Sequence, residues 1–152
     1  MIAEPGTVAP DFALSNQFGQ AVRLGEFRGV RPVTLVFFPL AFSRICEGEL
    51  CTLRDNFDVF EGAGTELLAV SVDSKHALRA WAEEQGYGFQ LLADFWPHGE
   101  VARAYGAFHD ERGHANRATF VIGVDGVIRS SFVTAQGEAR PLDRYREALA
   151  AL

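Results

Sequence analysis

The residues best suited to chemistry lie in one stretch, from Pro39 to Glu49. Within it, Cys46 is expected in the first turn of a helix that begins at about Arg44. Unpaired backbone N–H groups and the positive end of the helix dipole lie there, and both favour a thiolate over a thiol. Because the thiolate is the nucleophilic form of cysteine, this stretch is interpreted as a reactive-thiol site.

Two other residues of the stretch suit a boundary between a strand and a helix. Pro39 removes a donor from the strand ladder and fixes φ, so it ends the apolar strand before it. Ser43 is a residue type that commonly caps helix N-termini, and its hydroxyl lies one turn before the sulfur. Cys46 is therefore expected at a strand–helix junction.

The helix after this junction is expected to extend from Arg44 to about Phe60. On a wheel of 3.6 residues per turn, its apolar stripe begins with the thiol. The members of the stripe are Cys46, Leu50, Leu53, Phe57 and Phe60. The sulfur of Cys46 is therefore expected in a partly shielded pocket.

The second cysteine, Cys51, falls on the charged side of the same helix, where it is either a tolerated surface thiol or a second redox cysteine. Residues five apart on an α-helix are separated by about 7.5 Å of rise and ~140° of rotation. The Cα atoms of Cys46 and Cys51 are then roughly 8–9 Å apart, beyond the ~7 Å reach of a disulfide. Such a bond would require unwinding, which Gly48 eases by about 1 kcal/mol relative to Ala. The same glycine also suits close backbone packing.

Composition and charge narrow the class of protein. The 152 residues suit one domain, expected to cover residues 1–152. A net charge of −6 argues against nucleic acid or an anionic membrane as the main partner. No apolar run approaches the ~20 residues of a membrane span. Because Met1–Pro10 also lacks the pattern of a signal peptide, we expect a cytoplasmic protein.

The sequence predicts neither a metal site nor a nucleotide site. The two cysteines and four histidines show no zinc-ligand spacing. No Cys-x-x-Cys is present, and no glycine-rich phosphate loop follows the first buried strand. His109 and His114 flank Gly113 and are expected in a loop, as satisfied or solvated side chains. Two cysteines in a cytosolic chain of this size favour a catalytic or transient redox role over a structural disulfide.

The elements that position the thiol follow from hydrophobic periodicity. In chain order, the expected elements are a hairpin of Ala9–Leu14 and Ala21–Leu24, a buried strand at Val33–Phe38, the helix Arg44–Phe60, a buried strand at Glu66–Val72, a helix at Lys75–Gln85, a short strand at Leu91–Asp94, a short helix at Glu100–Tyr105, strands at Ala118–Val124 and Val127–Val133, and a helix at Leu142–Ala151. Asp125-Gly126 between the last two strands is a hairpin signal. This order predicts an α/β domain with a mixed central sheet and helices on both faces.

The pattern Pro39-x-x-x-Ser43-x-x-Cys46 resembles the Pro-x-x-x-Thr/Ser-x-x-Cys signature of the peroxiredoxins. The segments Phe37–Phe42 and Asp94–Gly99 are similar to those of the alkyl hydroperoxide reductase E type, and the order of elements agrees from about Val8 onward. This resemblance implies a thioredoxin-like fold. It also implies a thiol-dependent peroxidase that reduces hydrogen peroxide and organic hydroperoxides without metal, flavin or haem.

The resemblance also implies a role for individual residues. Cys46 would be the peroxidatic nucleophile that becomes a sulfenic acid. The hydroxyl of Ser43 would bond the peroxide and the thiolate, and Pro39 would shield the sulfur from water. Arg117 would complete the site from a distant strand, and Glu49 would lie near that arginine. Without the resemblance, the sequence favours a surface ion pair for Arg117 and a solvated charge on the helix for Glu49.

The chain departs from the family pattern at two positions. Serine replaces the commoner threonine at position 43. Cys51 has the spacing of a resolving cysteine in the bacterioferritin-comigratory-protein type, whereas the E type typically uses one cysteine and an external thiol. Two reductants therefore remain open: thioredoxin for a Cys46–Cys51 disulfide, or a low-molecular-weight thiol with a glutaredoxin-like partner for a sulfenic acid.

Assembly and a second class of function complete the expectations. Members of the family commonly dimerise through loops like Ala41–Phe42 and Phe95–Pro97, so a homodimer is expected; the alternative is that these aromatics pack locally over the helix start. The alternative function is a peroxide-responsive thiol sensor or a redox-regulated binding protein, in which Cys46 would be oxidised slowly and its oxidation would change the binding partner. The rate of its reaction with peroxide distinguishes this alternative from a peroxidase.

Overall fold

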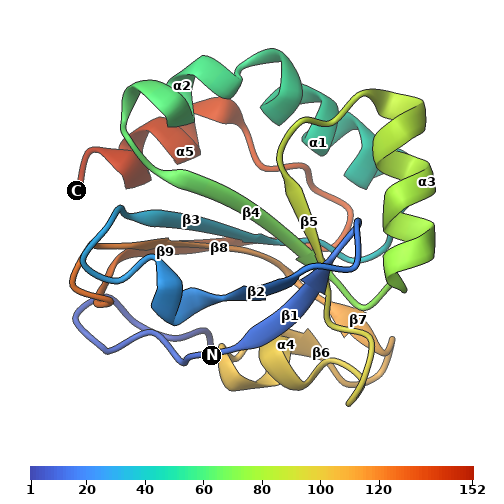
Figure 1. Ribbon diagram of the computed structural model, residues 1–152, viewed down its shortest axis with the longest axis horizontal. Helices are drawn as coiled ribbons and strands as arrows, with labels where there is room; N and C mark the ends of the chain where they lie inside the picture. Colours follow the sequence, from blue (N-terminus) through green and yellow to red (C-terminus); the bar gives the residue numbers. More distant parts are fainter.

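The core of the molecule is a sheet of seven strands in the order β2-β1-β5-β4-β3-β8-β9 (Figure 1). The computed structural model describes residues 1–152. The strands are β1 (Ala13–Asn16), β2 (Ala21–Arg23), β3 (Val33–Phe37), β4 (Glu66–Ser71), β5 (Gln90–Ala93), β8 (Arg117–Ile122) and β9 (Ile128–Thr134). The pairs β3–β4 and β4–β5 are parallel, and the other pairs are antiparallel. The expected mixed sheet is confirmed.

Helices cover both faces of this sheet, as the order of elements predicted (Figure 1). One face packs against α1 (Arg44–Asp55), α2 (Phe57–Gly62), α3 (Lys75–Gln85) and α5 (Leu142–Leu149). The other face packs against α4 (Glu100–Ala104) and the N-terminal segment with the 3-10 turn η1 (Leu24–Glu26). A small ribbon of β6 (Phe108–His109) and β7 (His114–Ala115) lies beside the sheet. None of the helices combines the length and the apolar character needed to cross a membrane.

The strand before the thiol, β3, is buried on both faces. Leu35 and Phe37 pack into the core on the α4 side, whereas Val36 and Phe38 pack into the core beneath α1 and α3. Successive side chains of a strand point to opposite faces, so a strand covered twice requires apolar residues at every position. The continuous apolar run was therefore a sound prediction of a central strand.

The prediction of one helix from Arg44 to Phe60 is wrong, because the helix breaks at Asn56. This residue leaves the helical region with φ −120° and ψ 29°. Its backbone N–H and its side-chain amide both donate to the carbonyl of Thr52, at 3.0 and 2.9 Å, so Asn56 closes the C-terminus of α1. The break turns Phe57 out of the predicted apolar stripe, and its ring stacks on Phe89 at the surface instead.

The hairpin of the last two strands is confirmed, with a longer connection than the sequence predicted. A two-residue turn at Asp125-Gly126 was expected, but β8 ends at Ile122 and β9 begins at Ile128. The N–H of Gly126 donates to the carbonyl of Gly123, and Gly126 takes a φ of +82° that a residue with a Cβ adopts only under strain. A register shift at the end of β8 accounts for the difference.

Candidate active site

Cys46 lies in the first turn of α1, directly after the loop that leaves β3, and is fully buried. Its Sγ is 3.3 Å from Nη1 of Arg117, which donates to the sulfur. The backbone N–H groups of a first helical turn have no partner within the helix. The sulfur therefore lies in the N-terminal turn of a helix and in contact with a guanidinium.

Arg117 is the first residue of β8, and the register of β8 against β3 brings it beside the end of β3. The residue is 3% exposed. Besides its bond to the sulfur, its Nε donates to the carbonyl of Gln136 at 2.8 Å, and its Nη1 donates to Oε1 of Glu49 at 2.6 Å. Three bonds fix the guanidinium, so the interpretation as a surface ion pair is wrong.

Glu49 follows Cys46 by three residues on α1 and is buried, so its interpretation as a solvated helix charge is also wrong. Its carboxylate accepts hydrogen bonds from Arg117 and from the N–H, Nε and Nη2 of Arg140, at distances from 2.6 to 3.1 Å. Burial by itself raises the pKa of Glu49. The charges and hydrogen bonds of Arg140 and Arg117 outweigh this effect and lower the pKa below its ordinary value.

Sequence reasoning missed Arg140, a buried residue in the segment before α5. Its Nη1 donates to the carbonyl of Ala118 and to Oγ1 of Thr119, at 3.0 and 3.1 Å, so it ties Glu49 to the start of β8. No local motif marks this arginine, because its partner carboxylate is 91 positions away. Two guanidiniums share one carboxylate here, so the cluster beside Cys46 carries one excess positive charge.

Replacing Glu49 with Gln is expected to destabilise the fold by about 3–5 kcal/mol, because two buried guanidinium groups lose their counter-charge. The pKa of Glu49 is lower in the folded than in the unfolded protein. The stabilisation of the folded protein by the ionised Glu49 carboxylate is therefore fully present above the ordinary glutamate pKa of about 4.3. It is lost as the pH falls through the folded-state pKa of Glu49. Urea denaturation of both proteins at a series of pH values measures the loss. Glu83→Gln on exposed α3 is the control, and a Glu49→Gln variant of wild-type stability at neutral pH would contradict this account.

A pocket lined mostly by polar residues adjoins the site through Pro39, Ser43 and Arg117, whereas the fully buried Cys46 is not part of its lining. The lining of this pocket consists of Pro39, Leu40, Ser43, Arg112, His114, Arg117, Gln136 and Gly137. Pro39 is buried between the end of β3 and α1, and Ser43 is half-buried at the N-cap position. Sequence analysis did not predict Arg112 or His114 at this pocket. Arg112 lies in the turn between β6 and β7, and His114 begins β7, so the fold of this ribbon brings both to the pocket.

The hydroxyl of Ser43 does not cap the helix as its residue type suggested. It donates to the carbonyl of Leu40 at 2.8 Å and makes no bond to an N–H of α1. The N–H groups of the first turn are therefore not engaged by this side chain. The preceding residue, Phe42, has a φ of 65°, a conformation that bulky residues rarely adopt. Strain of this kind concentrates at functional loops.

Cys51 is a half-buried free thiol on the flank of α1, not a freely exposed one. Its Sγ is 3.4 Å from Oη of Tyr87 and 3.6 Å from Oε1 of Gln85, both at or after the end of α3. α1 is continuous from Arg44 to Asp55, so the two cysteines lie on one intact helix. A bond between Cys46 and Cys51 would therefore require this helix to unwind and the contacts of Cys51 to break.

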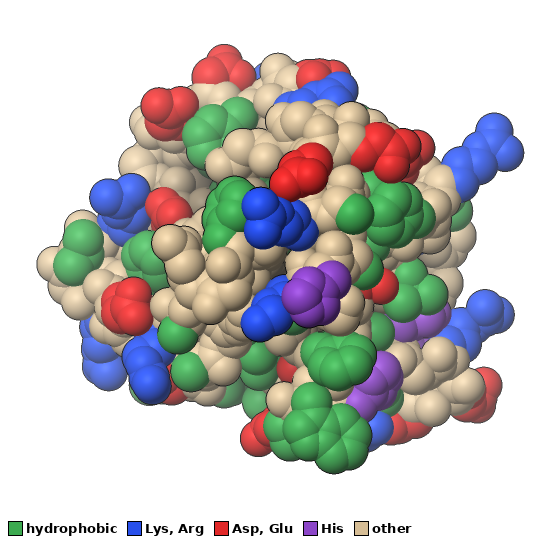
Figure 2. Space-filling view, turned by 45° about the vertical axis from the view of Figure 1, so that its right-hand side comes forward, with side chains coloured by type: hydrophobic (Ala, Val, Ile, Leu, Met, Phe, Trp, Pro, Cys, Tyr) green, Lys and Arg blue, Asp and Glu red, His purple; other side chains and the backbone are tan.

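Aromatic side chains of two loops are exposed near the N-termini of α1 and α3. Trp96 is 82% exposed, Phe95 54% and Phe42 51%. Trp96 and Phe95 line a shallow pocket against the first turn of α3. Figure 2 shows hydrophobic, histidine and basic side chains gathered on this side of the molecule. Large exposed aromatics of this kind suit contact with another protein surface.

Comparisons with known proteins found a family and relatives that match most of the chain. The model of the AhpC/TSA family matches residues 5–131. Alkyl hydroperoxide reductase E of Mycobacterium tuberculosis is 48% identical over 147 residues, covering 97% of this chain and 96% of that protein. A chloroplastic 2-Cys peroxiredoxin of Hordeum vulgare is 33% identical, covering 97% of this chain and 74% of that protein.

Two solved structures share the fold over nearly the whole chain. Reduced 2-Cys peroxiredoxin of Plasmodium vivax superposes with a TM-score of 0.87 at 26% identity, covering 97% of this chain and 81% of that one. Peroxidoxin BcpB of Mycobacterium tuberculosis superposes with a TM-score of 0.83 at 27% identity, covering 97% and 95%.

Proposed function

The chain belongs to the AhpC/TSA family of peroxiredoxins, whose members are thiol-dependent peroxidases with a thioredoxin-like fold, and on that premise we propose Cys46 as the peroxidatic nucleophile. The observation that carries this assignment is the contact of 3.3 Å between the buried Sγ of Cys46 and the guanidinium of Arg117. Hydrogen peroxide and organic hydroperoxides are the proposed substrates, and a thiol is the reductant.

The reaction begins with attack of the Cys46 thiolate on one peroxide oxygen. An S–O bond forms and the O–O bond breaks, so the sulfur is oxidised to a sulfenic acid and the second oxygen leaves as water or an alcohol after it takes a proton. Negative charge develops on the leaving oxygen. A guanidinium already fixed by Glu49 and Gln136 is placed to stabilise that charge without reorganising.

Ser43 and Pro39 are proposed to bind and shield the peroxide. The Ser43 hydroxyl donates to the Leu40 carbonyl and lines the pocket, so its lone pairs are open to a hydroperoxide O–H. The buried ring of Pro39 offers an apolar wall without an N–H, which limits access of water to the sulfur. Glu49 and Arg140 are proposed as positioning residues, because they act on the sulfur through Arg117.

Resolution of the sulfenic acid is proposed to follow one of two routes, which intact-mass measurement separates. After one equivalent of peroxide, an intrachain Cys46–Cys51 disulfide lowers the mass by two hydrogens, whereas a sulfenic acid raises it by one oxygen. We expect the added oxygen as the first product, because α1 holds the cysteines apart. No mass change at Cys46 would contradict the peroxidase assignment itself.

Replacing Cys51 with Ser tests the second step. If Cys51 resolves the sulfenic acid, turnover with thioredoxin as reductant falls by at least about tenfold in Cys51→Ser, while the first oxidation of Cys46 keeps its rate. If an external thiol resolves it, turnover with a low-molecular-weight thiol and a glutaredoxin-like partner is unchanged. Wild-type turnover of the variant with thioredoxin would exclude the intramolecular route.

We further propose the cytoplasm as the location, since both thiols are free.

A homodimer through the exposed aromatic loops is also proposed. Because truncating a buried tryptophan at an interface often costs more than about 2 kcal/mol, Trp96→Ala is expected to weaken dimerisation roughly thirtyfold. Sedimentation equilibrium measures the effect. Phe18→Ala removes another exposed aromatic, from the β1–β2 turn, and is the control. Identical dimerisation of the two variants, or a monomeric wild type, would count against this interface.

The alternative function, a peroxide-responsive sensor or redox-regulated binding protein, is not favoured. The relatives that match nearly the whole chain carry the names of reductases and peroxiredoxins. In addition, three residues around Cys46, namely Pro39, Ser43 and Arg117, line a pocket that can admit a small molecule.

A further inference from the structure

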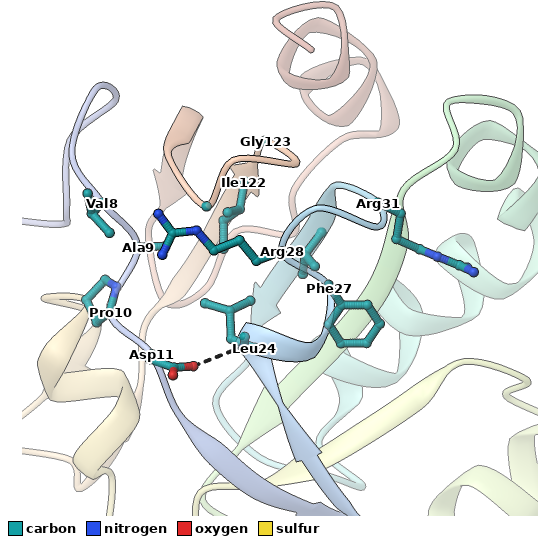
Figure 3. Close-up of a pocket in the computed structure, with 13 residues that line it drawn as sticks. Val8, Ala9, Pro10, Asp11, Leu24, Phe27, Arg28, Arg31, Ile122 and Gly123 are labelled. Atoms are coloured by element: carbon teal, nitrogen blue, oxygen red, sulfur yellow. Dashed lines mark hydrogen bonds between the residues drawn. The ribbon is translucent and has the colours of Figure 1, made fainter.

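A second cavity lies at the opposite end of the sheet from Cys46 (Figure 3). Three segments line it: Val8–Asp11 near the N-terminus, residues of the loop 24–31, and residues of the β8–β9 connection at 122–126. Val33, the first residue of β3, completes the lining. Because β3 runs from this cavity to the active-site loop, roughly 15 Å of strand separates the two sites.

Main-chain hydrogen bonds join the three walls of the cavity pairwise. They run from Ala9 N–H to Gly126 O (2.9 Å), from Leu24 N–H to Phe12 O (3.1 Å) and from Gly29 N–H to Val124 O (2.7 Å). These three hydrogen bonds fix the walls relative to one another without a ligand. The cavity is therefore preformed, as most small-molecule sites are.

The floor of the cavity is apolar. Leu24, Val33 and Ile122 are buried and belong to the core on the α4 side of the sheet. Val33 and Ile122 are direct register partners on β3 and β8, so their side chains lie next to each other. The volume of about 330 Å³ is at the lower end of the range for small-molecule sites. The floor therefore suits a short aliphatic group.

One cation of the cavity wall has no partner in the protein. Arg28 makes neither an ion pair nor a side-chain hydrogen bond, and Figure 3 shows it reaching across the cavity toward Val8. It passes close to Gly126, where a Cβ would lie 3.4 Å from its Nε. Arg31, in contrast, pairs with Glu66 at 3.2 Å and points away from the cavity. Arg28 is therefore a free guanidinium above an apolar floor.

The one carboxylate of the lining, Asp11, is already engaged. Its Oδ1 accepts from the N–H of Phe12 at 2.9 Å and from the N–H of Gly25 at 3.1 Å, and the second bond holds η1 against the N-terminal segment. Figure 3 places Leu24 between this carboxylate and Arg28. The carboxylate of Asp11 therefore has two main-chain donors of its own, whereas the guanidinium of Arg28 has no acceptor, and a carboxylate ligand would supply one.

We propose that this cavity binds a small aliphatic monocarboxylate. Its carboxylate pairs with the planar guanidinium of Arg28, which matches the two oxygens of a carboxylate. Its chain lies on the floor of Leu24, Val33 and Ile122, which leaves Asp11 to its main-chain partners. This site is separate from the peroxide pocket and does not depend on the proposed function of Cys46.

Titration of the reduced, full-length protein with octanoate tests the proposal, followed by amide NMR shifts and by thermal unfolding. Saturable shifts are expected at Leu24, Val33 and Ile122, with an unfolding temperature that rises with octanoate concentration. Octanol lacks the charge and acetate lacks the chain, so each is expected to bind more weakly. Arg28→Gln is expected to weaken octanoate binding roughly fivefold, as for a solvent-accessible ion pair.

The matched control is Arg23→Gln, which removes the same charge from an exposed position at the end of β2, outside the cavity lining. This variant is expected to bind octanoate like the wild type. The proposal fails if octanoate causes no saturable shift, if the shifts cluster around Cys46 instead, or if octanol binds as tightly as octanoate. It also fails if Arg28→Gln and Arg23→Gln bind octanoate equally well.

Discussion

Replacing Cys46 with Ser is expected to reduce peroxide consumption to the rate of the protein-free background. The hydroxyl of serine is far less acidic than a thiol, so the helix N-terminus and Arg117 would face a neutral alcohol rather than an anion. An alcohol cannot take up the peroxide oxygen as a thiolate does when it becomes a sulfenic acid, and the electron pair that breaks the O–O bond is no longer supplied. Loss of peroxide over time, with a thiol reductant in excess, measures the effect.

The control for this experiment is the Cys51→Ser protein, which removes a thiol from the same helix but keeps the sulfur beside Arg117. With one equivalent of peroxide and no reductant, this control is expected to consume peroxide as fast as the wild type. Full turnover in Cys46→Ser would end the assignment. A wild-type rate of peroxide reaction no faster than that of a free thiol would favour the sensor over the peroxidase.

Replacing Arg117 with Gln is expected to lower kcat/KM for hydrogen peroxide by about 10²–10³-fold, the usual cost of losing one preorganised donor to a developing negative charge. The substitution removes the guanidinium 3.3 Å from the sulfur. Arg117→Lys keeps the charge but not the planar group whose Nη1 donates to Glu49 and the sulfur while its Nε donates to Gln136, so an intermediate loss is expected. Stopped-flow measurement of peroxide reduction gives the values.

Stability must be measured in the same variants, because Arg117 also pairs with buried Glu49. Arg140 keeps its own bonds to that carboxylate, so Arg117→Gln is expected to fold. Arg79→Gln removes an exposed arginine from α3, paired only with Glu83, and is expected to leave kcat/KM unchanged. An Arg117→Gln protein with wild-type kcat/KM would remove this guanidinium from the mechanism.

The sequence alone was enough to identify Cys46 and its strand–helix junction. Both depend on local order: an apolar run that must be a strand buried on both faces, a proline that ends it, and an apolar stripe that begins with the thiol. Local patterns also located nearly every element of the sheet and its helices. They misplaced the helix end at Asn56, because an apolar stripe that continues across a break does not report where the backbone leaves the helical region.

The tertiary structure alone decided how the thiol is surrounded. The partners of Glu49 are 68 and 91 positions away, and only the register of β8 against β3 and the path of the chain before α5 bring them together. In the sequence, an arginine or glutamate that will be buried in an ion pair looks the same as one that will be solvated. The charges around Cys46 were thus set by long-range packing, whereas the thiol and its helix were set by neighbours in the chain.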